Sequence, residues 1–559
     1  AIMPTLPPPH NKLVTPLLTD LYQITMTYAY WKNSRHEDDS VFELFFRKNP
    51  FKGEYTIFCG LDEVLKFVDN FSFSKEDISY LQTVPALQNC EPDFWDYLYN
   101  LDCSGVTLHA MREGTLAFPR IPLIVVQGPL GIAQLLETTL LTLVNYPSLV
   151  ATNAARMVVA AQANMYPDSL TFHKRVPKCV EFGLRRAQGP DGGFSASKYS
   201  AVSGFVGTSN VQAGKLVGLS IAGTHAHAFV QAYSSLTEVD TLSVVDLTKG
   251  EGAGQVLLLP VVLKRREALG PKYQRTNDGE LAAFIAYAAA FPESFLCLID
   301  TYDTLRSGIL NFSCVAMVLV DLGYTPRGIR LDSGDLAYLS LQCAKHFSSI
   351  AASQDGGEKY QCFASLDIVA SNDINEEVLH ALNKQGHAIT VFGIGTNLVT
   401  CQAQPALGCV YKLVEIDGTP RMKLSQDIEK VLIPGKKKPY RLYGTDGWPL
   451  LDLLVGDKEE VPAIGERVLC RHPFIERKRA AVRASRILPL HHVVFDKGTV
   501  TAPLPTLQET KDYVKEQLAL VRPDLLRPLN PSPYKVSVSQ DLFTFLHDLW
   551  QAETPVMEM

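Results

Sequence analysis

The sequence has little of what marks membrane proteins and nucleic-acid-binding proteins. Its apolar runs, of which 256–263 is among the longest, stop well short of the eighteen or so residues that a membrane span needs. The net charge is −7, so there is no surplus of basic residues for nucleic acid. With 46% hydrophobic and 20% charged residues, the composition is typical of a soluble globular protein without a transmembrane helix.

The eleven cysteines include no CxxC pair, which argues against a zinc site or a disulfide framework. Reduced, mostly buried thiols in the cytosol fit this pattern, so we expect a cytosolic protein. Residues 1–16 carry four prolines among the first nine positions and show no signal-peptide pattern. We expect them to form a disordered lead-in.

The middle of the chain alternates short apolar runs with helical segments. Runs at 295–299, 328–331, 366–370 and 389–392 end at Asp300, Asp332, Ser371 and Gly393. Their spacing suits βα units, which predicts an α/β fold with an irregular (β/α) barrel and a site where its strands end. One such residue after a strand is usually an ordinary loop residue. The ends of four successive strands that each offer one favour a functional site.

The length of 559 residues predicts two or three domains. We expect the barrel to occupy residues 131–413. Residues 17–130 and 414–559 should pack together as a second α/β domain. Patterns in these flanking segments predict helices at 20–31, 507–521 and 540–553, a strand at 41–47 and a hairpin at 440–453.

The motif around His225 and His227 allows three interpretations. After a predicted strand at 216–221, two histidines two residues apart point to one face. They could be buried histidines with local partners, or metal ligands, although the later strand ends supply no further histidine. In the third interpretation one histidine accepts a phosphoryl group and Asp300 or Asp303 orients it.

Three further motifs suit an anionic ligand. The segment 181–189 pairs Arg185 with Arg186 before a glycine-rich turn at 204–210, an arrangement that holds anions but also occurs on ordinary surfaces. The segment 328–335 places an arginine beside carboxylates that can meet ribose hydroxyls or Mg²⁺. The segment 392–396 offers bare backbone to a phosphate.

These motifs together resemble the nicotinate phosphoribosyltransferase family, from about Leu17 to the C-terminal region. The matching segments are LLTDLYQITM (17–26), FELFFR (42–47), EFGLRRAQGPDGG (181–193), GTSN (207–210), GTHAHAFV (223–230), DTYD (300–303), RLDSGD (330–335), GIGT (393–396), VYKLV (410–414) and PRMKLS (420–425). The chain departs from the family's pattern at Val206, where a polar residue is usual, and in the long stretch 162–179.

The resemblance implies a role for each matching residue. His227 would be the phosphorylated histidine, and of the two carboxylates named above Asp300 is the one that we expect to orient it. The residues implied to hold nicotinate are Tyr22, Phe182, Arg185, Ser209, Thr224 and Arg330. Those implied to hold phosphoribosyl pyrophosphate are Asp332, Ser333, Gly393, Gly395 and Thr396. Arg47, Lys423 and Lys430 would reach the site of a second subunit in a homodimer. No residue is implied as a direct metal ligand.

The resemblance also implies an activity. Nicotinate and 5-phosphoribosyl 1-pyrophosphate would give nicotinate mononucleotide and pyrophosphate in NAD salvage, coupled to ATP hydrolysis through a phosphohistidine, with Mg²⁺ or Mn²⁺. A nicotinamide phosphoribosyltransferase is the nearest alternative, but that enzyme carries an aspartate where this chain has Ser209. A carboxylate there would repel the acid substrate. A quinolinate enzyme, a metal-dependent barrel hydrolase and a catalytically idle scaffold are weaker alternatives.

Overall fold

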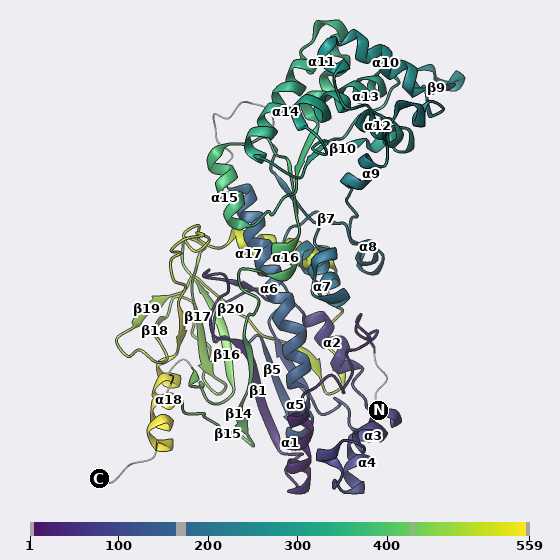
Figure 1. Ribbon diagram of the computed structural model, residues 1–559. Coiled ribbons are helices and arrows are strands. Elements are labelled where there is room, and N and C mark those ends of the chain that lie inside the picture. Colours follow the sequence, from purple (N-terminus) through teal and green to yellow (C-terminus); the bar gives the residue numbers. More distant parts are fainter. Residues whose placement is uncertain (1–4, 164–174, 426, 428–429, 555–559) are drawn as a thin grey trace. The chain divides into compact units, whose positions relative to one another are not determined.

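A computed structural model describes residues 5–163, 175–425, 427 and 430–554, and the chain divides into two compact units (Figure 1). Unit 1 comprises residues 1–153 and 403–559, so it is built from both ends of the sequence. Unit 2 comprises residues 154–402. The barrel limits predicted above, residues 131 and 413, lie outside unit 2. Most of the long stretch 162–179, one of the two departures from the family's pattern, lies outside the described residues.

Unit 1 contains two large sheets. The first is antiparallel, in the order β15 (Thr419–Pro420), β14 (Cys409–Ile416), β1 (Asp39–Phe46), β5 (Ile124–Pro129), β3 (Thr107–Ala110), β21 (His492–Asp496) and β22 (Thr499–Val500). The second has the order β19 (Arg479–Arg483), β18 (Arg467–Arg471), β23 (Val536–Val538), β17 (Pro449–Gly456), β16 (Lys437–Tyr443) and β20 (Arg486–Pro489). β2 (Thr56–Ile57) pairs with β4 (Leu116–Ala117).

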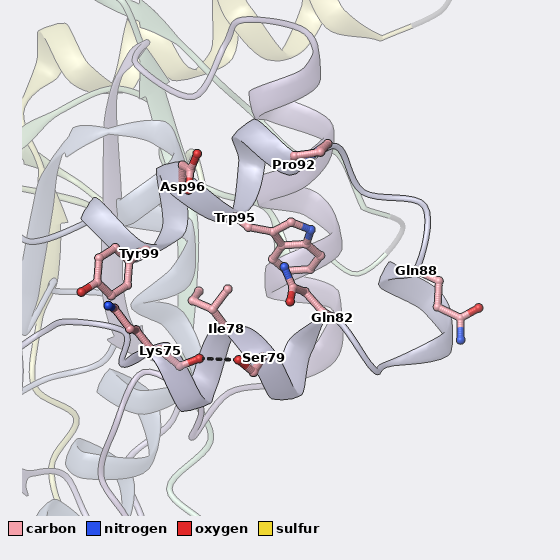
Figure 2. A pocket seen from close by; sticks show the side chains of 9 residues that line it. All are labelled: Lys75, Ile78, Ser79, Gln82, Gln88, Pro92, Trp95, Asp96 and Tyr99. Carbon is pink, nitrogen blue, oxygen red and sulfur yellow. Dashed lines mark hydrogen bonds between the residues drawn. The ribbon is translucent and has the colours of Figure 1, made fainter.

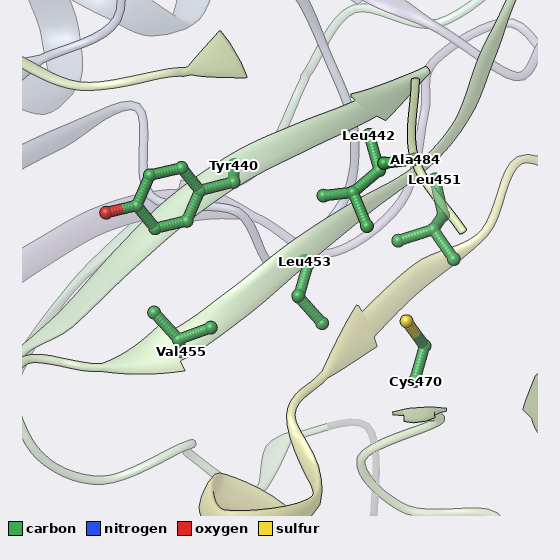
Figure 3. Close-up of a cluster of buried hydrophobic side chains, with 7 residues drawn as sticks. All are labelled: Tyr440, Leu442, Leu451, Leu453, Val455, Cys470 and Ala484. Atoms are coloured by element: carbon green, nitrogen blue, oxygen red, sulfur yellow. The ribbon is translucent and has the colours of Figure 1, made fainter. Parts of the chain in front are cut away.

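Alternating side chains build the core of the second sheet. Tyr440 and Leu442 on β16 and Leu451, Leu453 and Val455 on β17 are buried together with Cys470 and Ala484 (Figure 3). Positions two apart on a strand share a face, so this periodicity buries one side of the predicted hairpin. β16 and β17 pair antiparallel across the turn at 444–447, which confirms the hairpin.

The helices of unit 1 are α1 (Leu21–Lys32), α2 (Leu61–Asp69), α3 (Lys75–Leu81), α4 (Pro92–Asn100), α5 (Leu130–Leu135), α17 (Leu507–Ala519) and α18 (Gln540–Glu553); α6 (Glu137–Gln162) begins in this unit. The structure confirms the helices predicted near both ends of the chain. Thr506 begins α17 with a capping box, its side chain and that of Glu509 exchanging hydrogen bonds with each other's backbone.

The disordered lead-in expected from the prolines does not match the described part of that segment. The backbone N–H groups of Thr5 and Leu6 donate to the Asp69 carboxylate at 2.7 and 2.6 Å, and that of His10 donates to Glu63 at 3.0 Å. Proline removes only its own N–H group, so the residues between the prolines can still bond to α2.

Unit 2 is built on a six-stranded parallel sheet that forms a half-barrel. Its order is β10 (Leu296–Leu298), β11 (Gly328–Leu331), β12 (Asp367–Ala370), β13 (Val391–Ile394), β6 (Lys178–Glu181) and β7 (Gly207–Thr208). Every neighbouring pair is parallel, which confirms the four strands predicted in the middle of the chain. The carboxyl ends of all six strands therefore meet at one edge.

The helices of unit 2 are α7 (Gly189–Val202), α8 (Val211–Val217), α9 (His227–Gln231), α10 (Leu258–Ala268), α11 (Pro271–Gln274), α12 (Asp278–Ala290), α13 (Ile309–Asp321), α14 (Leu336–Ala351), α15 (Glu376–Gln385) and α16 (Thr396–Thr400); β8 (Ser243–Val245) and β9 (Gln255–Leu257) form a small hairpin. The π-helix η6 (Thr304–Gly308) leads into α13. The stretch Thr304–Asp321 is long and apolar enough to cross a membrane by composition, but 78% of it is buried, as in the core helix of a soluble protein.

The strand predicted at 216–221 is wrong. Residues 211–217 form α8, Gly218 ends this helix with φ +71°, and Ile221 makes a single parallel bridge to Thr208. The Asn210 side chain accepts a hydrogen bond from the Ala213 N–H group, and this cap favours a helix over the strand that the apolar residues indicated.

Candidate functional site

A pocket of about 490 Å³ opens at the carboxyl ends of the parallel strands of unit 2. It is lined by Phe182, Arg185, Arg186, Arg330, Asp332, Ser371, Asn372, Asp373, Ile374, Asn375, Gly393, Gly395, Thr396, Asn397 and Gln402. Seven of the predicted ligand-binding residues are in this set. The lining combines three arginines, two aspartates and glycine backbone, a composition suited to an anionic ligand with hydroxyl groups.

Arg330, Ser371 and Asp332 form a directed hydrogen-bond network on one side of the pocket. Arg330 Nε donates to Ser371 Oγ at 2.6 Å, and Ser371 Oγ donates to Asp332 Oδ1 at 2.6 Å. Arg330 Nη2 also donates to Asp332 Oδ1, at 3.1 Å. The Arg330 side chain is only 14% exposed, so the guanidinium is fixed within the wall of the pocket.

Phe182 and two glycines of the 393–396 segment form another side. The Arg330 guanidinium lies over the Phe182 ring, 5.3 Å from its centroid. A Cβ atom at Gly393 would lie 2.5 Å from Phe182 Cδ2, so only glycine lets this ring reach its position. Arg186 Nη1 donates to Thr396 Oγ1 at 3.4 Å.

A buried carboxylate anchors the segment that carries Phe182. Glu181, at the end of β6, is fully buried and accepts hydrogen bonds from the Gly183 N–H group, Ser197 Oγ and Thr208 Oγ1. A buried carboxylate with several donors is a stable arrangement, because both of its oxygens accept hydrogen bonds.

His227 begins α9 beside the end of β10. Its Nδ1 lies 3.0 Å from Thr301 Oγ1, and its Nε2 lies 3.8 Å from Asp332 Oδ2. Asp300, the predicted orienting carboxylate, has different partners: its Oδ2 accepts from the Asp332 N–H group at 3.0 Å and from Ser333 Oγ. In this arrangement a hydroxyl holds one ring nitrogen, and the nearest carboxylate faces the other.

His225 faces away from this position. Its ring is surrounded by Phe229, Phe284 and Tyr287, and its Nε2 accepts a hydrogen bond from the Leu298 N–H group at 3.4 Å. Burial lowers the pKa of His225 to about 4, so the ring is neutral near pH 7. The shared face expected for the two histidines is therefore wrong, because residues 222–226 form no strand.

The remaining predicted residues of unit 2 lie at neighbouring loops. The Ser209 N–H group donates to the Glu181 carbonyl at 3.0 Å, so the serine follows the end of β7. The Thr224 hydroxyl is buried and has no hydrogen-bond partner among the described residues. Arg185 lines the pocket and is exposed, and Ser333 is exposed.

Unit 1 holds the predicted basic residues and Tyr22. Tyr22 is 48% exposed, and its hydroxyl donates to Glu137 Oε1 at 3.2 Å. The positive charges of Arg47 and Lys423 both act on Lys412 of β14. Burial is the largest cause that lowers the pKa of Lys412 below the ordinary lysine value; the charge of Glu137 opposes the shift, and those of Arg47 and Lys423 add to it. Lys430 is exposed and pairs with Asp427 at 2.6 Å.

A second cavity, about 730 Å³, lies in unit 1 between α3 and α4 (Figure 2). It is lined by Lys75, Ile78, Ser79, Gln82, Gln88, Pro92, Trp95, Asp96 and Tyr99. Lys75 is the one basic residue of this lining, and Asp96 balances its charge. The cavity of unit 2, with its three arginines, suits a phosphorylated substrate far better.

The sequence did not single out three residues that organise the site, namely Thr301, Ser371 as a bridge, and Glu181. Each lies at or just after the end of a strand of the parallel sheet, and this position is the one feature of the sequence that could have pointed to them. Within residues 5–163, 175–425, 427 and 430–554, no group of three or more His, Cys, Asp or Glu side chains is arranged to hold a metal ion.

The fold and the pocket define an α/β protein with an anion-binding site at the ends of parallel strands. Family models match along the chain: the nicotinate phosphoribosyltransferase N-terminal domain at residues 17–145, the family model at 177–443 and the C-terminal domain at 436–546. The chain belongs to the nicotinate phosphoribosyltransferase family.

Individual relatives match over nearly their whole lengths. The chain is 52% identical to the nicotinate phosphoribosyltransferase of Dictyostelium discoideum, over 99% of this chain and 91% of that protein. It is 49% identical to that of Caenorhabditis elegans, over 98% and 96% of the two chains. The crystal structure of human nicotinic acid phosphoribosyltransferase, 40% identical, superposes with a TM-score of 0.82 over 95% of this chain and 99% of that one.

Proposed function

We propose that this protein is a nicotinate phosphoribosyltransferase, which makes nicotinate mononucleotide and pyrophosphate from nicotinate and 5-phosphoribosyl 1-pyrophosphate. The observation that carries the proposal is the pocket of unit 2. There Arg330, Asp332 and the backbone of 393–396 lie at the ends of neighbouring parallel strands. Family membership points to the same activity.

Nicotinate would bind through its ring and its carboxylate. Phe182 offers an aromatic face, with Arg330 and Arg185 as the cations for the carboxylate. Ser209, Thr224 and Tyr22 are the further residues that we assign to this substrate. The unpartnered Thr224 hydroxyl supports its assignment, because a buried hydroxyl is costly unless a ligand completes its hydrogen bond.

Phosphoribosyl pyrophosphate would bind along the other strand ends. Asp332 and Ser333 are assigned to the ribose, and Gly393, Gly395 and Thr396 to the 5-phosphate. Glycine leaves the backbone N–H groups open to phosphate oxygens. As pyrophosphate leaves, positive charge develops at the ribose C1 atom, and the pyridine nitrogen must be held in line to attack it.

A divalent cation fits the donor set. Asp332 lines the pocket, and Asp300 Oδ1 is a buried carboxylate oxygen with no hydrogen-bond partner among the described residues. Carboxylate oxygens are ligands that Mg²⁺ prefers, and it usually binds through one or two of them plus substrate phosphates. Asp300 and Asp332 would hold the Mg²⁺ or Mn²⁺ ion, and the ion would offset the charge of the pyrophosphate.

His227 would couple the reaction to ATP. A ring nitrogen attacks the γ-phosphorus, the N–P bond forms as the P–O bond to ADP breaks, and water later releases inorganic phosphate. Thr301 fixes the ring through Nδ1, and Asp332 lies near Nε2. Asp300 would orient the ring indirectly, through its bond to the Asp332 N–H group.

The assembly and location are also proposals. Arg47, Lys423 and Lys430 would serve the site of a second subunit in a homodimer. The charges of Arg47 and Lys423 both lower the pKa of Lys412, so basic groups gather at this part of unit 1 and could meet an anionic substrate. The half-barrel sheet of unit 2 would form part of the irregular (β/α) barrel of the family. All eleven cysteines are free thiols, which is consistent with the cytosol.

A product assay tests the activity. Purified protein is incubated with nicotinate, phosphoribosyl pyrophosphate, Mg²⁺ and ATP, and nicotinate mononucleotide, pyrophosphate and ADP are measured. Parallel reactions replace nicotinate with nicotinamide or omit ATP. Formation of nicotinate mononucleotide supports the proposal. A product formed from nicotinamide alone would favour the nicotinamide enzyme instead.

A further inference from the structure

Ser371 occupies a position that joins two charged side chains of the pocket. It follows β12, and its hydroxyl accepts from Arg330 Nε and donates to Asp332 Oδ1, both at 2.6 Å. A hydroxyl is among the few small groups that can accept and donate in the same place. Alanine can do neither, and a carboxylate could not donate to Asp332.

The network determines which edge of Arg330 remains open. A guanidinium has five N–H groups, and its Nε and Nη2 groups form one fork while Nη1 and Nη2 form another. Ser371 and Asp332 take the Nε–Nη2 fork. The Nη1–Nη2 fork therefore keeps its hydrogens for another partner, and its geometry matches the two oxygens of a carboxylate.

Packing restricts this orientation further. The guanidinium lies over the Phe182 ring, and the Phe182 ring lies against Gly393. A Cβ atom at Gly393 would also lie only 3.0 Å from Ser371 Cβ, so the serine is packed closely against that strand. Arg330 is thus held by hydrogen bonds on one edge and by an aromatic ring on one face.

We propose that Ser371 is a positioning residue that sets the carboxylate specificity of this site by fixing Arg330 with its Nη1–Nη2 fork available to the substrate. The inference rests on the proposed function, since nicotinate supplies the carboxylate. Ser371 itself would not touch the reacting atoms. It acts through Arg330, and it fixes Asp332 Oδ1 while Oδ2 remains near His227.

The test compares Ser371→Ala with Ser371→Thr, which retains the hydroxyl. We expect Ser371→Ala to raise KM for nicotinate at least about tenfold, a change of about 1.4 kcal/mol. KM for phosphoribosyl pyrophosphate should rise clearly less than KM for nicotinate, because Asp332 keeps the hydrogen bond that its N–H group donates to Asp300 and the one that it accepts from Arg330 Nη2. The phosphorylation of His227 by ATP should change by less than about threefold. Ser371→Thr should recover most of the affinity for nicotinate. Ser349→Ala is a matched control, because Ser349 is an exposed serine of α14 whose hydroxyl donates to a backbone carbonyl.

A double-mutant cycle isolates the route through Arg330. In an Arg330→Lys background, Ser371→Ala should raise KM for nicotinate less than about twofold, because the fork that Ser371 positions is already absent. Equal effects in both backgrounds, or equal increases of KM for both substrates, would overturn the inference while leaving the proposed function intact. A wild-type protein inactive with nicotinate would overturn both. Thermal unfolding of each variant verifies that it is folded.

Discussion

Thr301 Oγ1 lies 3.0 Å from Nδ1 of His227, so a hydroxyl rather than a carboxylate holds this ring nitrogen. A hydroxyl can donate or accept, and it can therefore stay bonded whether Nδ1 carries a proton or not. A histidine that gains and loses a phosphoryl group changes its protonation during each cycle. Thr301 is suited to hold the ring through these changes.

This relationship gives a first prediction about ATP. His227→Ala should abolish formation of a phosphoenzyme from γ-labelled ATP while leaving slow, uncoupled synthesis of nicotinate mononucleotide. Thr301→Val, which keeps the shape but removes the hydroxyl, should slow phosphorylation about five- to tenfold, as expected for the loss of one hydrogen bond of about 1 kcal/mol. If His227→Ala still accepts phosphate, another residue is the acceptor. If Thr301→Val is as fast as the wild type, Thr301 does not position the ring.

The buried ring of His225 gives a prediction about acid stability. Burial lowers its pKa from 6.5 to about 4, so the folded protein keeps the ring neutral while the unfolded chain protonates it below pH 6.5. Unfolding is then favoured as pH falls from about 6.5 to 4, by up to about 3 kcal/mol. His225→Gln retains an acceptor for the Leu298 N–H group but does not titrate.

Urea unfolding of both proteins at about pH 7 and about pH 4.5 measures this effect. The free energy of unfolding of the wild type, relative to His225→Gln, should fall by about 2–3 kcal/mol at the lower pH. The comparison cancels the other buried histidines, such as His346 and His387, whose pKa values are also lowered to about 4 by burial. A pH-independent difference between the two proteins would show that folding does not lower the pKa of His225.

The sequence predicted the strands better than it predicted the contacts between their ends. Asp332, Ser371 and Gly393 could be placed at one edge, because apolar runs of strand length ended at them and parallel strands align their carboxyl ends. That Ser371 bridges Arg330 and Asp332 depends on side-chain orientation, which the spacing of residues does not encode. The strand predicted at 216–221 failed because its apolar residues are shared between the end of α8 and a single bridge.

Gly393 provides a prediction about shape. In Gly393→Ala the new Cβ atom would meet Phe182 Cδ2 at 2.5 Å, so the ring that supports Arg330 must move. We expect KM for nicotinate to rise by about tenfold or more, since displaced aromatic packing and a misplaced arginine each weaken binding. Gly254→Ala is the control, because an added Cβ there meets no described atom within 4 Å. Equal kinetics for both variants would contradict the assignment of Phe182 to nicotinate.

The proposed homodimer with shared sites leads to a complementation test. Arg47→Ala and His227→Ala should each be inactive in coupled synthesis. After mixing and exchange, half of the dimers are hybrids, and each hybrid has one site with both residues intact. Activity should therefore recover to about a quarter of the wild-type value. If hybrids form but stay inactive, Arg47 and His227 of one site come from the same subunit. A fully active monomer would contradict the shared sites.

Ser209 carries the last prediction, which concerns the choice between nicotinate and nicotinamide. Nicotinate is an anion at pH 7, and charge-assisted hydrogen bonds to an arginine are worth about 1.5–3 kcal/mol. The wild type should therefore prefer nicotinate over nicotinamide by at least about tenfold to a hundredfold. Ser209 follows β7, and its N–H group is bonded to the carbonyl of Glu181, which precedes Phe182 in the chain.

Ser209→Asp should reduce this preference mainly by raising KM for nicotinate, because two like charges then share the site. Ser209→Asn is the matched control, as it adds a side chain of similar size without a charge. Steady-state kinetics with both pyridines on all three proteins separates charge from bulk. If Ser209→Asn weakens nicotinate binding as much as Ser209→Asp does, steric crowding is responsible. A wild type that uses both pyridines equally well would contradict the role given to the charge of the substrate.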